Sequence, residues 1–442
     1  MNRLTITVAL TAVLFSQLSH GNDLAKSIEA DYRDRLGAMF RDFHINPELS
    51  TGEFRTAKKL AKALRKSGFK VTEGVGGTGV VALLKNGPGP LVMMRGDMDG
   101  LPLLEKTDLE YASKAMHKDP ITGNTVPVMH ACGHDVHVTS LIGTAKQMAD
   151  RKDDWSGTLM LIGQPAEERV LGARAMMKDD LWQRFGKPDY AMAFHVAAGL
   201  PAGMINVQEG APYAGADTVD IIIHGVGAHG ASPHAGKDPV LLGSQIVVAL
   251  QTLVSRELPP RQAGVVTVGS FHSGTKHNII SDRAHLQLTV RNTNLDTRRT
   301  LLEGIERIAV NLGRVAGLPD DKLPEVIVSE ESTPPTVNND SMVRRLKKVW
   351  MRKLGADKVS SIVSQGMGAE DFPYFTTDPA IASVYFSVGG TSLEDLAASK
   401  TGGAPIPSHH SPLFKIEPEP AITSGIQATV LALFELMPKQ SS

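Results

Sequence analysis

Hydrophobic positions in the first part of the chain follow a helical spacing and then gather into short apolar runs. Apolar residues between Ala57 and Leu64 recur between lysines and arginines, so the pattern predicts helix across residues 22–70, ended by Gly68. Residues 138–150 show a second helical pattern. Strands that alternate with helices favour an α/β layer around a largely parallel sheet. The apolar runs that predict its buried strands are residues 80–84, 91–94, 158–163 and 190–196.

Residues 215–330 follow a different pattern. Three strands and two amphipathic helices are predicted there, and Pro259-Pro260 ends the first helix. Helix and strand alternation resumes after Thr333-Pro334-Pro335. We therefore expect a discontinuous first domain, residues 22–210 and 332–442, and an inserted α+β domain, residues 211–331, with two helices on a four-stranded antiparallel sheet. The insert's predicted strands are 217–224, 264–271 and 284–291, and its helices are 240–258 and 297–315.

The composition narrows the class of protein. The chain has 442 residues, of which 42% are hydrophobic and 21% charged, as in ordinary soluble globular proteins. The length indicates two domains or more. A formal net charge of -1 gives no electrostatic reason to expect nucleic acid or an anionic membrane as a partner.

The N-terminus is typical of an export signal. Arg3 precedes an apolar run over residues 4–18, and Ser19-His20-Gly21 supplies small residues for a cleavage site. We predict a signal peptide at residues 1–21 and an exported, periplasmic or secreted protein; the alternative is an uncleaved membrane anchor. With a single cysteine the chain forms no internal disulfide.

That cysteine lies in the segment richest in metal-binding side chains. Residues 129–137 read Met-His-Ala-Cys-Gly-His-Asp-Val-His, which places Cys132 two residues before His134. Thiolates and imidazoles are preferred ligands of zinc and similar metals, and an extended loop could direct both at one ion. A cysteine nucleophile and a buried apolar residue are the alternatives.

Further polar residues follow the predicted strands. Asp97, the pair Glu167-Glu168 and His195 each lie near a strand's carboxyl end, where ligands gather in parallel sheets. Two adjacent carboxylates would repel each other in a dry site, but a metal on one relieves this and leaves the other to move a proton. Late in the chain, His409-His410 adds two more imidazoles.

These segments together resemble the co-catalytic metallopeptidase family of aminoacylases and carboxypeptidases. More closely they resemble its amidohydrolase branch, which holds hippurate hydrolases, N-acyl-amino-acid deacylases and auxin-conjugate hydrolases. The resemblance extends over nearly the whole chain after the signal peptide. Its segments, in order, are 44–50, 97–102, 129–135, Gln164-Pro165-Ala166-Glu167-Glu168, 368–372 and His410-Ser411-Pro412.

The resemblance implies a zinc-peptidase-like catalytic domain that binds two divalent metal ions, with zinc, manganese, cobalt or nickel as candidates. Glu167 would be the general base and acid, and Asp99 would hold a metal-ligating histidine or the base by a hydrogen bond. Asp97 falls where other branches place a histidine ligand. The metal ligands implied are Cys132, His134, Glu168, His195 and His410.

For the insert, the resemblance implies a lid and dimerisation domain. His229 would reach the active site of a neighbouring subunit and stabilise the oxyanion, so a homodimer is expected. Asn278 and Arg291 match lid positions that contact substrate. Arg169, which follows the glutamate pair, departs from the family pattern and bears on substrate choice.

The function that this predicts is metal-dependent cleavage of the amide bond in N-acyl amino acids, by a water that Glu167 deprotonates. The expected partner is a small N-acyl amino acid or peptide, with no nucleic acid and, for the mature form, no membrane. The alternative is a metallo-dipeptidase, aminopeptidase or carboxypeptidase of the same fold.

Overall fold

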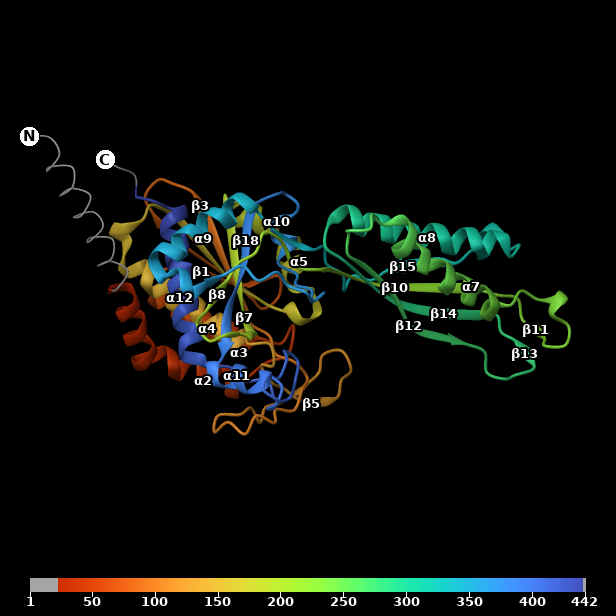
Figure 1. Ribbon diagram of the computed structural model, residues 1–442, viewed down its shortest axis with the longest axis horizontal. Coiled ribbons are helices and arrows are strands. Elements are labelled where there is room, and N and C mark those ends of the chain that lie inside the picture. The colour runs from red at the N-terminus through yellow and green to blue at the C-terminus, as the bar shows by residue number, and fades with distance from the viewer. Residues whose placement is uncertain (1–22, 440–442) are drawn as a thin grey trace, which may run out of the picture. The chain divides into compact units, whose positions relative to one another are not determined.

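The computed structural model describes residues 23–439, so the predicted signal peptide lies outside the described residues. Within the described chain the residues cluster into two compact units (Figure 1). The first is built from residues up to 212, from 338–363 and from 374 onward, and the second from 213–337 and 364–373. The sequence pattern did not indicate that residues 364–373 belong with the insert. Backbone contacts hold them there, since the Ala214 N–H donates to the Gly368 carbonyl at 2.8 Å.

The first unit contains a mixed, mostly parallel sheet, which confirms the predicted fold class. Its strand order is β1-β2-β6-β3-β7-β18-β8-β17, and β6, β3, β7 and β18 run parallel to one another. Their carboxyl ends therefore meet at one edge of the sheet. The bounds are β1 Lys70–Val75, β2 Gly79–Asn86, β3 Leu91–Asp97, β6 Gly157–Gln164, β7 Tyr190–Pro201, β8 Ile205–Asn206, β17 Val359–Ser360 and β18 Ala382–Thr391.

Helices from both ends of the chain pack on this sheet and close its core. α4 contacts β3 and α12, while α12 also contacts α9 and β18, and α3 contacts β1 and β2. Each carries a buried apolar face, for example Leu60 and Leu64 on α3. The bounds are α2 Gly37–Ile45, α3 Phe54–Lys66, α4 His134–Asp150, α5 Gly172–Lys178, α6 Leu181–Phe185, α9 Asp340–Leu354, α10 Pro373–Thr376, α11 Leu393–Lys400 and α12 Pro418–Leu436.

The prediction of helix across residues 22–70 is wrong in the middle. Helix ends at Ile45, and α3 begins only at Phe54. The reason is Pro47, because a proline disfavours helical backbone in the residue before it, and Asn46 has φ -125° and ψ 56°. Gly68 does follow the end of α3, with φ +84°, a left-handed conformation that glycine adopts without strain.

The second unit is the predicted α+β module. Its four-stranded antiparallel sheet has the order β12-β14-β10-β15, and α7 and α8 cover one face (Figure 1). Alternate residues such as Ile221 and Leu286 point into its own core. The strands are β10 Gly215–His224, β12 Gly264–Ser273, β14 Arg283–Asn292 and β15 Glu325–Val328, and the helices are α7 Pro239–Thr252 and α8 Leu295–Val315.

Short elements complete the described chain. β11 and β13 form a two-stranded ladder, in which His229 lies opposite Ile279. Their bounds are β11 Ala228–His229 and β13 Ile279–Ile280, and the other short pairs are β4 Met116–Lys118 with β5 Thr125–Pro127 and β9 Gly210–Tyr213 with β16 Thr336–Asn338.

Candidate metal centre

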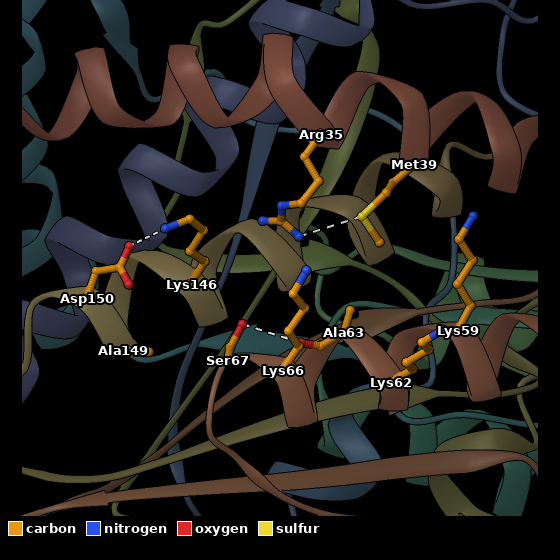
Figure 2. A pocket seen from close by; sticks show the side chains of 10 residues that line it. All are labelled: Arg35, Met39, Lys59, Lys62, Ala63, Lys66, Ser67, Lys146, Ala149 and Asp150. Carbon is orange, nitrogen blue, oxygen red and sulfur yellow. Dashed lines mark hydrogen bonds and ion pairs between the residues drawn. The ribbon is translucent and has the colours of Figure 1, made fainter.

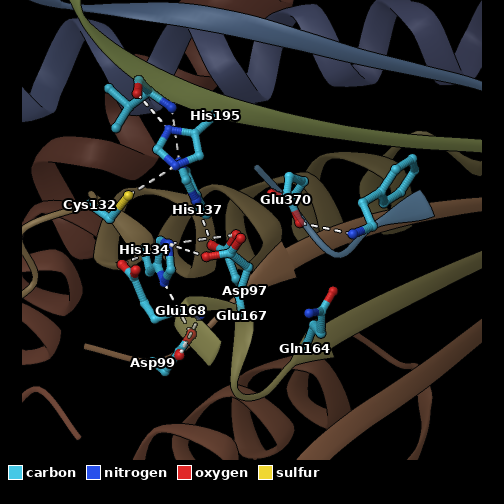
Figure 3. Close-up of polar contacts among 12 residues, drawn as sticks. Asp97, Asp99, Cys132, His134, His137, Gln164, Glu167, Glu168, His195 and Glu370 are labelled. Carbon is cyan, nitrogen blue, oxygen red and sulfur yellow. Dashed lines mark hydrogen bonds and ion pairs between the residues drawn. The ribbon is translucent and has the colours of Figure 1, made fainter. Parts of the chain in front are cut away.

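The carboxyl ends of β3 and β6 and the middle of β7 bring the predicted ligand-type side chains together (Figure 3), since β7 continues past His195 to Pro201 and His195 is not near its end as predicted. Two groups of three side chains share the same cysteine. In each group the candidate ligand atoms all lie within 4.8 Å of one another. The groups are Cys132 with His134 and His195, and Cys132 with Glu168 and His410.

Gly133 shapes the segment that carries Cys132 and His134. It has φ +86°, and a side chain there would place a Cβ 2.3 Å from Val196 Cγ1. The left-handed turn starts α4 at His134, one turn earlier than the predicted start at residue 138. His134 therefore lies on the first turn of a helix, not in an extended loop, and glycine is needed for both backbone and space.

The glutamate pair follows β6 on a short turn held from two sides. Ala166, with φ +47°, donates its N–H to Glu53 Oε1 at 2.8 Å, and the Glu168 N–H donates to Asp99 Oδ2 at 3.1 Å. Burial, followed by the charge of Asp99, raises the pKa of Glu53 to about 7. Both Glu167 and Glu168 are thus presented by a fixed backbone, which supports their use as functional groups.

The electrostatics around His134 favour a cation. The side chain is fully buried, and its Nε2 has no hydrogen-bond partner, although carboxylate oxygens of Asp97, Glu167 and Glu168 lie 3.7–3.9 Å away. Burial alone would lower the pKa of His134, but Asp97 and Asp99 outweigh it and raise that pKa to about 10. A divalent metal at this place would supply the positive charge and bind the unpartnered nitrogen, so the residues fit a metal centre.

His195 offers a neutral nitrogen to the same centre. Burial, together with the charges of His137 and His409, holds the pKa of His195 well below its usual value. Its Nε2 lies 3.3 Å from Cys132 Sγ, while its Nδ1 bonds to the Val196 carbonyl at 2.7 Å. An imidazole with one nitrogen bonded to a carbonyl and the other facing a thiol is oriented as metal-binding histidines are.

His410 comes from a loop before α12. Its Nε2 is 3.2 Å from Glu168 Oε2, and its N–H donates to the Ala131 carbonyl at 2.9 Å. The hydrogen bond to Glu168 raises the pKa of His410. The loop thus joins the segment before Cys132 to the glutamate turn, which explains how a residue so late in the chain reaches the cluster.

Asp99 sits behind the cluster and contacts several of its members. Oδ1 lies 3.2 Å from His134 Nδ1, and Oδ2 accepts from Ser50 Oγ at 2.7 Å.

A buried histidine on α2, His44, lies next to the first turn of α4. It bonds Asp135 at 2.7 Å and Glu105 at 3.1 Å. Burial opposes protonation of His44, but those two carboxylates outweigh it and raise its pKa to about 9.

The remaining predicted residues belong to the second unit. His229 and Asn278 are exposed neighbours on β11 and just before β13, where the Gly230 N–H donates to the Asn278 carbonyl at 2.8 Å. Arg291 is half-buried near the opposite end of β14. Sequence reasoning did not single out Glu53 and treated one of His409 and His410 as a plain loop residue, because spacing alone does not reveal which side chains fold inward.

A separate basic cavity of about 620 Å³ lies between the N-terminal helices and α4 (Figure 2). Three of its cations pair with nearby carboxylates, namely Arg35 with Asp31, Lys59 with Asp42 and Lys146 with Asp150. Its lining contains no histidine or cysteine, and its one carboxylate, Asp150, pairs with Lys146, so it lacks the ligand set of the first cluster. Its lining is Arg35, Met39, Lys59, Lys62, Ala63, Lys66, Ser67, Lys146, Ala149 and Asp150.

A buried thiol, imidazole and carboxylate cluster at the edge of a parallel sheet, beside a second glutamate, defines a metal-dependent hydrolase. Residues 93–401 match the family model Peptidase family M20/M25/M40, and the chain belongs to this family. Hippurate hydrolase from Campylobacter jejuni is 37% identical over 78% of this chain and 86% of that protein. Thermostable carboxypeptidase 2 from Saccharolobus solfataricus is 35% identical over 83% of this chain and 89% of its own length.

Solved structures show the same fold. A dinuclear metal-binding peptidase of the M20 family from Bacillus subtilis superposes with a TM-score of 0.73 at 27% identity, covering 93% of this chain and 99% of that one. The family resemblance predicted from the motifs is therefore confirmed. The protein is an enzyme that hydrolyses amide bonds and uses divalent metal ions.

Proposed function

We propose that the protein releases amino acids from N-acyl amino acids at a centre of two divalent metal ions. The observation that carries this proposal is the pair of ligand groups that share Cys132, with Glu167 next to them. Five ligands are more than one tetrahedral ion needs, and they suit two. Cys132, His134 and His195 would hold one ion, and Cys132, Glu168 and His410 the other. Ions bound there lower the pKa of water and polarise a carbonyl oxygen.

Glu167 is the proposed proton carrier. Its Oε2 lies 3.7 Å from His134 Nε2, so the carboxylate faces the ligand cluster from a buried position. It takes a proton from water as the water oxygen bonds to the acyl carbon. It returns this proton to the amide nitrogen as the C–N bond breaks, which yields a carboxylic acid and an amine. Asp99 fixes His134 and the Glu168 backbone during these steps.

We propose that the lid supplies an oxyanion donor. The Ala231 N–H donates to His229 Nδ1 at 3.0 Å, so Nδ1 is the acceptor and the ring proton lies on Nε2. Because His229 is exposed, this N–H is available to a substrate carbonyl that gains negative charge. Asn278 lies beside it and is proposed to contact the same substrate.

The second unit by itself supports assistance between subunits. Arg291 and Arg283 lie eight residues apart along β14, roughly 27 Å at strand spacing, and β13 precedes Arg283. His229 and Arg291 of one chain are therefore too far apart to contact one small substrate. We propose that Arg291 binds the substrate carboxylate and that His229 serves the active site of a second copy.

The proposed homodimer would form through α7 and β12. Leu241 and Val248 on α7 are 59% and 72% exposed, and β12 is an edge strand whose outer backbone is open to pairing. By length and composition, the helix Pro239–Glu257 could also cross a membrane, with 33% of it buried. We interpret its exposed apolar residues as a subunit interface, because Leu242 and Ile246 pack on the lid sheet.

We also propose export, on the basis of the apolar segment at residues 4–18. N-terminal sequencing of protein recovered from the periplasm or medium tests this. A mature chain starting near Asn22 supports it, and retention of residues 1–21 contradicts it.

A substrate panel tests the proposed activity. Metal-loaded protein is compared on N-acetyl and N-benzoyl amino acids, on dipeptides with a free amine, and on longer peptides cleaved at the carboxyl end. N-acyl amino acids should be the preferred substrates, because the sequence motifs do not single out an acidic site for a free α-amine. Preferred cleavage of dipeptides or of C-terminal residues would instead assign the protein to a peptidase, an activity that the name of the Saccharolobus relative gives for that protein.

A further inference from the structure

The peptide groups of Val196 are a meeting point for three histidines. Val196 follows His195 in β7, but β3 pairs with β7 only as far as Ala193. β18 continues to pair with β7 as far as Pro201, but the N–H and C=O of Val196 bond to side chains. Because buried N–H and C=O groups need partners, the side chains that bond here are fixed by the strand.

The backbone N–H of Val196 determines which ring nitrogen of His137 carries the proton. The Val196 N–H donates to His137 Nε2 at 2.9 Å, so that nitrogen is an acceptor and the ring proton lies on Nδ1. Nδ1 is 2.6 Å from Asp97 Oδ1, and Asp97 Oδ2 pairs with Arg95. Both nitrogens of His137 are used, so His137 is not a metal ligand even though it lies close to His134 and Asp97.

The Val196 carbonyl accepts hydrogen bonds from two imidazole rings. His195 Nδ1 lies 2.7 Å and His409 Nε2 lies 2.9 Å from this oxygen. A carbonyl cannot donate, so both nitrogens carry protons, and His195 Nε2 is left unprotonated toward Cys132. The Val196 carbonyl oxygen therefore orients His195, a candidate ligand, and also anchors the loop that carries His410, another candidate ligand.

The ring of His409 is also packed in place. It lies tilted against Phe414 with centroids 4.9 Å apart and edge-on to His195 at 5.1 Å. The next residue, His410, has φ +63°, a conformation that a non-glycine residue keeps only when its surroundings hold it. The bond of His409 to the Val196 carbonyl holds this conformation together with two contacts of His410 itself, to the Ala131 carbonyl and to Glu168.

We propose that His409 is a positioning residue, which ties the loop of His410 to the Val196 carbonyl and so sets the affinity of the metal ion that Glu168 and His410 would hold. This inference rests on the proposed metal centre. The Asp97-His137 pair would act on His195 through the preceding peptide group, whose N–H is that of Val196.

Two substitutions of equal length separate the hydrogen bond from packing. His409→Gln places an amide N–H near the position of Nε2, whereas His409→Met fills similar space without a donor. Metal content and dissociation constants are measured for the purified proteins by titration against a competing chelator, without substrate. Removal of a hydrogen bond behind a ligand weakens metal binding by about 10- to 100-fold.

The expected result is that His409→Met binds one ion as tightly as the unmodified protein and the second about 10- to 100-fold more weakly. His409→Gln should restore much of this affinity. Leu413→Ala, an exposed position in the same loop, is the control and should change neither ion. Alkylation of Cys132 should stay slow in His409→Met, because the first ion still protects the thiolate.

Equal affinities in His409→Met and the unmodified protein would overturn the inference and leave the metal centre intact. Loss of both ions, with fast alkylation of Cys132, would also overturn it, since the effect would not be confined to the site of His410. Failure of the unmodified protein to bind two ions would instead contradict the proposed metal centre. Thermal unfolding of the metal-free variants checks that the fold is retained.

Discussion

The two sheets of this protein use polar side chains in opposite ways. At the edge of the eight-stranded sheet, Asp97, His134 and His195 are buried and held by neighbours within hydrogen-bonding distance. On the four-stranded sheet, the contacts His224–Glu325 and His285–Asp220 join partly exposed side chains. Exposed pairs of this kind contribute little stability.

This difference in burial suggests that the first unit carries out the chemistry and that the exposed residues of the second unit take part in recognition. A cluster that must bind metal and activate water works best when its groups are fixed and shielded before substrate arrives, because electrostatic effects are stronger out of water. His229 and Asn278, by contrast, are exposed on a small unit of their own, where a substrate or another chain can reach them. Substitutions in the two units should therefore fail in different ways.

The largest expected effect is that of Glu167→Gln. Loss of the proton carrier should lower kcat by about 10²- to 10⁴-fold, because the side-chain amide of glutamine cannot take a proton from water. Metal content should remain at the level of the unmodified protein, since Glu167 is not among the proposed ligands. Steady-state kinetics and metal analysis of the same sample check both. Activity retained in Glu167→Gln would contradict the mechanism.

Much of this buried site could be predicted from the sequence. The strands that contain Asp97 and His195 and the strand that precedes Glu167 are local apolar runs, and parallel strands place their carboxyl ends together regardless of detail. The helix break at Pro47 and the early start of α4 at Gly133 were missed, because they depend on single backbone conformations. The part played by Glu53 was not predictable, since it arises from a contact across 113 positions with the Ala166 N–H.

The second unit was predictable as a module but not as a site. Helical and strand spacing indicated its architecture, and the family motif indicated His229. The long separation of His229 from Arg291 follows only from the register, in which Arg283 and Arg291 lie near opposite ends of β14. Sequence spacing cannot supply this, because the 61 residues between His229 and Arg291 include α7, β12 and β13.

The next effect in size should come from His229→Ala. Removal of one oxyanion donor should lower kcat by about 10²- to 10³-fold, while metal binding and thermal stability stay unchanged. Kinetics, metal analysis and thermal unfolding measure the three. Unchanged kcat would contradict the role of His229. Loss of metal would show that His229 supports the metal centre and does not act only on the substrate.

Mixed dimers sharpen this prediction. When Glu167→Gln and His229→Ala chains are unfolded and reassembled together, one site of each mixed dimer combines an intact Glu167 with an intact His229 only if His229 acts on the other subunit. Random mixing should then restore about a quarter of the activity of the unmodified dimer. No recovery, with mixed dimers demonstrated by a size tag on one chain, would show that His229 does not assist across subunits.

A smaller effect is expected for Arg291→Lys. Lysine keeps the charge but loses the paired N–H groups that match a carboxylate, so KM should rise about tenfold with little change in kcat. Arg291 is half-buried, so a carboxylate that pairs with it must approach the surface of the second unit closely. Measurement on N-acyl amino acids and on their amides provides the control, because an amide lacks the carboxylate. An equal rise for both substrates would contradict the assignment.

The smallest expected effect is on stability and concerns His44. Its pKa is raised from 6.5 in the unfolded chain to about 9, so its bonds to Asp135 and Glu105 stabilise the fold fully below pH 6.5. This contribution should disappear as the pH rises through about 9, because neutral His44 leaves a buried carboxylate without a positive partner.

Denaturant unfolding of metal-free protein at pH 6 and pH 9.5 measures this contribution. His134, whose pKa is raised from 6.5 to about 10, also makes stability depend on pH over that range, so the informative quantity is the difference between the unmodified protein and His44→Gln. That difference should be large at pH 6 and shrink at pH 9.5. A constant difference would mean that His44 stabilises α4 by packing and neutral hydrogen bonds, and that the charge buried behind the metal centre belongs to the carboxylates alone.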